Sequence, residues 1–119
     1  MESTLFILGR VVFGVYFAWS GLNHFINMKA MTGYAASKKI PSPEMAVMGT
    51  GLLLLLGGLG MALNINMRMA AILLLIFLIP TTFLMHAFWN DHDAMAKMGN
   101  RVNFMKNCAL IGALLMILG

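Results

Sequence analysis

Four basic side chains interrupt stretches that are otherwise apolar, and they are Arg10, His24, His86 and Lys106. A charged side chain costs about 2.5–3.5 kcal/mol at the centre of a membrane helix on insertion scales, so each is a candidate functional residue. Imidazole exchanges protons near neutral pH. Asn23 adjoins the first histidine and Asn107 adjoins the lysine, and an amide both donates and accepts hydrogen bonds. These residue types favour hydrogen bonding and proton exchange with a small polar group.

The two histidines and the lysine fall at similar depth if successive apolar stretches cross a membrane in alternating directions. His24 is near the end of the first stretch, His86 near the end of the third, and Lys106 early in the fourth. We expect these three side chains, with Asn23 and Asn107, to form a polar pocket. Such a pocket would bind a quinone head group through hydrogen bonds to its carbonyls.

Other interpretations of the same residues remain open. Lys106 and Arg10 could extend to lipid head groups while the histidines satisfy interfacial carbonyls. Two histidines could ligate a haem, although no further haem-binding pattern accompanies them. The 13 methionines could hold Cu(I), but they lack a repeated array with cysteine or histidine, and methionine is a common filler of apolar helices. We therefore expect no metal site. Pairs of methionines three residues apart occur at Met28/Met31, Met45/Met48 and Met95/Met98.

The first apolar stretch carries its polar and small residues on one helical face. Arg10, Gly14, Phe17, Gly21 and His24 are spaced by four, three, four and three residues. Small residues permit close helix contact, so this face is expected to point inward. A rise of about 1.5 Å per residue separates the buried charge of Arg10 from His24 by roughly 20 Å, too far to share one small ligand.

Further glycines are expected at helix contacts, within the chain or against a second copy or a partner. The predicted helix-packing positions are Gly14, Gly21, Gly57, Gly58 and Gly112.

The elements that must position these residues are four membrane-spanning helices. Of 119 residues, 61% are hydrophobic and 10% are charged, against about 25% charged in a soluble domain. The apolar runs lack the alternation of barrel strands, and only helices or closed barrels satisfy the backbone in lipid. We predict an all-α polytopic membrane protein, a four-transmembrane-helix bundle in a single domain, 1–119. Its helices are predicted at about 5–26, 45–63, 69–89 and 102–118.

Local signals mark the ends of these helices. Ser42 is a predicted N-cap, followed by Pro43 at the first helical position and Glu44 in the first turn. Asn64 to Asn66 is expected to form a tight turn. Pro80 removes a hydrogen bond to the Ile76 carbonyl and is expected to kink the third helix, with the following threonines able to satisfy freed groups. The loop at 27–42 is expected to contain a short amphipathic segment.

The distribution of basic residues predicts the orientation in the bacterial inner (cytoplasmic) membrane. Loops 27–42 and 90–101 are predicted to be cytoplasmic and both termini to lie outside, because cytoplasmic loops carry the excess of lysine and arginine. The net charge of +4 is attributed to anionic lipid rather than nucleic acid as a partner. The single Cys108 excludes an intrachain disulfide. The two loops hold Lys29, Lys38, Lys39, Lys97 and Arg101, and the opposite side holds Arg68.

Several segments together resemble the DoxX family of small bacterial membrane proteins, over nearly the whole chain. They are Arg10, Phe17 and Ser20-Gly21-Leu22-Asn23-His24; Ile40-Pro41-Ser42-Pro43 and Leu56-Gly57-Gly58-Leu59; Pro80-Thr81-Thr82-Phe83 and His86-Ala87-Phe88-Trp89; and Phe104 to Gly112.

The resemblance implies a four-helix inner-membrane protein, in a family named after a subunit of a thiosulfate:quinone oxidoreductase. It also implies that Arg10, His86, Lys106 and Asn107 are key positions, without giving their chemistry. Many relatives carry a glutamate before the Gly-Gly pair of the second helix. Leu54-Leu55-Leu56 stands there in this chain.

Three functions compete at this point. A quinone-linked or oxidative-stress-related subunit needs a partner, because the chain has no flavin or haem motif and no cysteine pair. We expect no intrinsic cofactor, a quinone as the possible ligand, and no catalysis by this chain alone. A structural or assembly subunit is the alternative, followed by a small-molecule transporter acting as a dimer, for which Glu44 is the only nearby acid. A homo-oligomer or a larger membrane redox complex is expected in the lipid bilayer.

Overall fold

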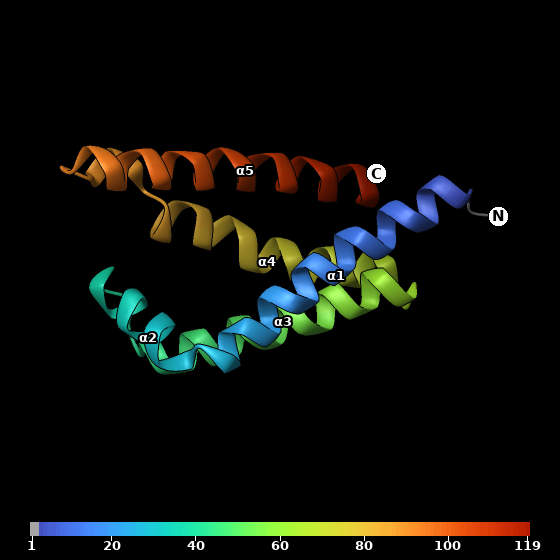
Figure 1. Ribbon diagram of the computed structural model, residues 1–119. Helices are drawn as coiled ribbons and strands as arrows, with labels where there is room; N and C mark the ends of the chain where they lie inside the picture. The colour runs from blue at the N-terminus through green and yellow to red at the C-terminus, as the bar shows by residue number, and fades with distance from the viewer. Residues whose placement is uncertain (1–2) are drawn as a thin grey trace.

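The computed structural model describes residues 3–119, and within them the chain is entirely helical between its turns (Figure 1). Four helices are long and apolar enough to cross a membrane: α1, α3, α5, and α4 together with the short 3-10 helix η1. The prediction of an all-α polytopic membrane protein is confirmed. In chain order the elements are α1 (Thr4–Ile26), α2 (Met28–Ser37), α3 (Pro43–Leu63), α4 (Met67–Met85), η1 (Phe88–Asn90) and α5 (Ala94–Leu118).

The long helices are packed in sequence rather than in a closed ring. α1 packs along α3, α3 along α4, and α4 along α5, whereas α1 and α5 make no comparable contact. α1 and α5 therefore do not pack along each other, and we call the side of the bundle between them the open side. Figure 1 shows the start of α1 and the end of α5 at one end of the molecule and α2 at the other. The longest dimension is 49 Å, close to the ~40–45 Å thickness of a bilayer with its head groups.

The contact between α1 and α3 is close because glycines lie on both helices. A Cβ atom at Gly14 would be 2.5 Å from the Ala62 nitrogen and 2.6 Å from the Gly58 oxygen, which leaves no room for a side chain. The inward face predicted for α1 is the buried one, with Gly14, Phe17, Gly21 and His24 all buried.

Arg10 extends the same face toward the end of α3. Its Nη1 donates to the carbonyl oxygens of Met61 at 3.2 Å and Ala62 at 2.6 Å. A cation at a helix C-terminus satisfies carbonyls that have no partner within the helix. The arginine therefore joins α1 to α3 and lies away from the cavities described below.

The other glycines predicted to pack differ from one another. A Cβ at Gly58 would meet the α1 backbone at Gly14 and Ala18, and one at Gly21 would meet Leu55 and Gly51. A Cβ at Gly57 would lie 2.8 Å from the Leu74 side chain. At Gly112 it would meet nothing within 4 Å. Gly112 is thus not a packing position within this chain.

Two helix boundaries differ from their predicted positions. α5 begins at Ala94 rather than near 102, because the Asp93 carboxylate accepts from the Ala96 N–H at 2.9 Å and caps a polar first segment. α4 ends at Met85 rather than near 89, and the chain then bends at His86 and Ala87 before η1. The amphipathic segment expected in the first loop is a helix, α2.

Caps and the internal proline also show local differences. Ser42 stands at the N-cap of α3 but has a φ of 45° and no side-chain cap bond. Asn66, by contrast, caps α4 by accepting from the Met69 N–H at 3.2 Å. α4 continues through Pro80. The Thr82 hydroxyl donates to the Leu78 carbonyl at 2.6 Å. It therefore does not satisfy the Ile76 carbonyl, whose hydrogen bond Pro80 removes.

Candidate functional site

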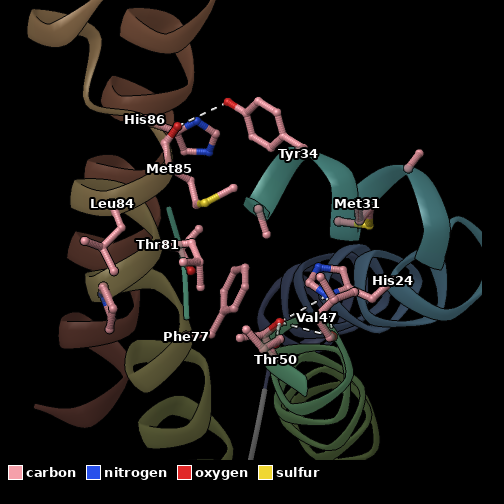
Figure 2. Close-up of a pocket in the computed structure, with 15 residues that line it drawn as sticks. His24, Met31, Tyr34, Val47, Thr50, Phe77, Thr81, Leu84, Met85 and His86 are labelled. Carbon is pink, nitrogen blue, oxygen red and sulfur yellow. Dashed lines mark hydrogen bonds between the residues drawn. The ribbon is translucent and has the colours of Figure 1, made fainter. Parts of the chain in front are cut away.

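Two adjoining cavities lie toward the α2 end of the bundle and share a wall. The larger, about 500 Å³, lies among α2, α3 and α4 and is lined mainly by apolar side chains. We call it the apolar cavity; Figure 2 shows His86 and Tyr34 at one end of it and His24 with Thr50 at the other. The smaller, about 280 Å³, lies among α1, α4 and α5, and we call it the polar cavity. The residues that line both are His24, Met31, Phe77, Thr81 and His86.

The polar cavity contains all the side chains that sequence spacing suggested would meet. They come from the end of α1, the end of α4 and the middle of α5. Sequence reasoning overlooked the other polar groups of the wall, which are Tyr16, Ser20, Thr81 and Asn103. The predicted residues that line it are Asn23, His24, His86, Lys106 and Asn107.

Asn107 is the most unusual of these residues. It is 5% exposed, and within residues 3–119 its amide has no hydrogen-bond partner. Its amide atoms are not fully enclosed by the protein, and the residue lines the polar cavity. Its amide is therefore available to a ligand in the polar cavity.

Lys106 bridges the open side of the bundle. Its Nζ donates to the Tyr16 hydroxyl at 3.1 Å and lies 5.8 Å from the centre of the Tyr16 ring. Both residues are exposed toward the gap between α1 and α5 and line the polar cavity. An ammonium group in an apolar setting is available to oxygen atoms of a bound molecule.

His24 is held by α3. Its Nδ1 lies 3.0 Å from the Val47 carbonyl oxygen and 3.2 Å from the Thr50 hydroxyl. The imidazole can reach this carbonyl because Gly51 has no side chain; a Cβ there would be 2.9 Å from the His24 Cβ. The ring of Phe77 packs against the imidazole edge to face, with centroids 5.9 Å apart.

His86 is held by a polar network that joins α2, η1 and α5. Its Nδ1 lies 3.3 Å from Asn100 Oδ1, and Asn100 Nδ2 donates to Asp91 Oδ2 at 2.8 Å. Asp91 Oδ1 is 3.9 Å from Lys38 Nζ. The Tyr34 hydroxyl donates to the Met85 carbonyl at 3.2 Å, which is free because α4 ends there. The bend after α4 is thus tied to both neighbouring helices.

The remaining side chains of the site form their own contacts. Asn23 accepts a hydrogen bond from Asn27, one turn later. Arg10 is absent from the walls of both cavities, as its distance from His24 along α1 led us to expect. Within residues 3–119, no three histidine, cysteine, aspartate or glutamate side chains gather in an arrangement that could hold a metal ion.

A family model described as DoxX matches residues 5–87. The matched segment includes both histidines and ends before α5, so Lys106 and Asn107 lie beyond it. No match was found among curated proteins or among solved structures.

Proposed function

Because the chain belongs to the DoxX family, we propose that it is a redox-associated membrane subunit whose polar cavity binds the head group of a quinone. The observation that supports this most is Asn107, which is buried in the cavity wall and has no partner within the described residues. Its amide atoms keep some accessible surface, so a ligand carbonyl in the cavity would accept a hydrogen bond from the amide N–H. Lys106 supplies a second donor on the same helix.

The two cavities suit the two parts of a membrane-soluble quinone. Ligand pockets usually enclose about 300–1,000 Å³, so a polar cavity of about 280 Å³ suits a head group and not a whole molecule. The apolar cavity of about 500 Å³ adjoins it and can hold part of the chain. The open side between α1 and α5 would connect the polar cavity with lipid, because Tyr16 of α1 and Lys106 of α5 both line that cavity and are exposed. A quinone would then reach the site from within the bilayer.

Electron transfer requires a second protein in this proposal. No haem or flavin motif occurs in the sequence, and the protein contribution to such chemistry is to position the cofactor and adjust its electrostatics. The chain would bind the quinone, and a partner in a larger membrane complex would exchange electrons with it.

The direct test is titration of the purified protein in lipid nanodiscs with a decyl-substituted benzoquinone, followed by tryptophan fluorescence. We expect Lys106→Met and Asn107→Leu each to weaken binding by roughly tenfold, the effect of one hydrogen bond to a charged or buried group. Arg68→Gln is the matched control, because Arg68 lies at the start of α4 and bonds to the Leu118 carbonyl. Equal binding by all four proteins would rule out the polar cavity as the quinone site.

A docking subunit without chemistry is a second candidate, favoured by the exposure of α5. That helix buries only Asn107 and Leu114, and Gly112 faces open space. Gly112→Leu should release a co-purifying partner or a second copy without unfolding the chain if this surface is an interface. Transport is not supported in the same way, because Glu44 is exposed at the start of α3 and neither cavity has an acidic residue in its wall.

A further inference from the structure

The hydrogen-bond network around His86 determines which ring nitrogen carries the proton. Asn100 Nδ2 donates to the Asp91 carboxylate at 2.8 Å, which orients the amide and turns its oxygen toward His86. An amide oxygen only accepts hydrogen bonds. Nδ1 of His86 must therefore be the protonated nitrogen in this contact. In the neutral imidazole, Nε2 then carries a lone pair and accepts.

His24 reaches the same state through a different partner. Its Nδ1 faces the Val47 carbonyl oxygen at 3.0 Å, and a carbonyl cannot donate. The nearby Thr50 hydroxyl uses its hydrogen on the Ala46 carbonyl at 2.6 Å. Nδ1 of His24 is therefore a donor as well, and Nε2 of the neutral ring is an acceptor. Within residues 3–119, neither Nε2 atom has a hydrogen-bond partner.

From these contacts we infer that the site prefers the hydroquinone form of its ligand to the quinone form, because both histidines offer a ligand an acceptor. The inference rests on the proposed function and specifies which redox state the cavity recognises. Each hydroquinone hydroxyl brings a hydrogen that Nε2 of a wall histidine accepts. Quinone carbonyls bring only lone pairs, which leave both Nε2 atoms unsatisfied.

The other polar groups of the cavity do not discriminate between the two forms. The Lys106 ammonium donates to an oxygen in either redox state. The Asn107 amide donates and accepts, so it also serves both. The preference therefore depends on the histidines and on the residue that orients His86, Asn100, which does not line the polar cavity. Asn100 is a positioning residue in this scheme.

The test compares three probes of nearly equal shape in nanodiscs at pH 8 without oxygen: a decyl-substituted hydroquinone, the corresponding quinone and the hydroquinone dimethyl ether. We expect the hydroquinone to bind roughly tenfold more tightly than either of the others, because only it donates. Equal affinity for hydroquinone and quinone would overturn the inference and leave the proposed function standing. Failure of all three probes to bind would overturn both.

A variant and a spectroscopic measurement separate the positioning role from a structural one. Asn100→Leu should reduce the preference for hydroquinone from about tenfold to about threefold while quinone affinity changes little, because His86 can then change tautomer whereas His24 is still held by Val47. Asn90→Leu is the control, an equivalent change at an exposed site. Nitrogen NMR of labelled histidine in the unliganded protein should show Nδ1–H for His24 and His86. A finding of Nε2–H for both rings would contradict the inference independently of any ligand.

Discussion

At the scale of single residues, the polar side chains of the site differ in what could be predicted from sequence. The depth of each residue in its apolar stretch was enough to bring Asn23, His24, His86, Lys106 and Asn107 to one cavity wall. The partners that hold the histidines were not predictable in the same way. Val47 contacts His24 only through its backbone carbonyl. Every residue has such a carbonyl, so no residue type in the sequence indicates this contact. Asn100 lies in a polar segment that we assigned to a loop.

Substitution of Asn107 is predicted to affect the stability of the protein and its affinity for quinone differently. Asn107→Leu should leave the free energy of unfolding of the unliganded protein within about 1 kcal/mol of the wild type, because the amide forms no hydrogen bond to another described residue that the change would remove. The same change should weaken quinone binding. Reversible unfolding in detergent with and without quinone measures both effects.

Asn90→Leu is a suitable control for this prediction, because Asn90 is exposed in η1 and should change neither quantity. A loss of more than about 2 kcal/mol in the unliganded Asn107→Leu protein would mean that the amide is already satisfied.

At the scale of elements, sequence patterns located the apolar parts of the helices and misplaced their polar extensions. Hydropathy measures the segment that can lie in lipid, so it could not show that α5 extends outward to Ala94 under the Asp93 cap. The inward face of α1 was predictable because charge and small residues repeat at helical spacing. The environment of Gly112 was not predictable, because a small residue shows that a close helix contact is possible but not which helix makes it.

Two glycines allow the close packing of helices to be tested against a matched control. Gly58→Ala should destabilise the protein by about 1–3 kcal/mol or more, because the new methyl group would overlap the α1 backbone. Gly112→Ala should be neutral or stabilise by up to about 1 kcal/mol, since alanine is the better helix former and the position faces open space. Unfolding of both variants in the same detergent gives the comparison. Equal losses would contradict the contact geometry.

At the scale of the whole molecule, the chain is a multi-pass membrane protein whose bundle is closed on three sides. The number of crossings could be predicted from length and hydropathy, since each crossing needs about 20 apolar residues. The open side could not, because it depends on how far α1 and α5 diverge while each packs on its own neighbour. Orientation in the membrane remains a prediction from the basic residues of the loops.

Site-directed labelling tests that orientation. With Cys108 replaced by serine, Ser37→Cys at the end of α2 should react with a membrane-impermeant maleimide only when the cytoplasmic face is accessible. Asn64→Cys, in the turn between α3 and α4, should react from the opposite face. The reverse labelling pattern in intact cells and inverted vesicles would show that the orientation predicted from the loop lysines and arginines is wrong.

If the polar cavity binds a membrane-soluble ligand as proposed, the gap between α1 and α5 also determines what competes for it. Lipid acyl chains next to this gap would then compete weakly with the ligand for the same space. The occupancy of the cavity is then governed by the mole fraction of ligand among the lipids, and hardly by its concentration in water. Diluting the protein into more lipid at constant total ligand would empty the site, whereas adding buffer would not. An affinity measured for such a ligand should therefore be expressed as a mole fraction in the lipid.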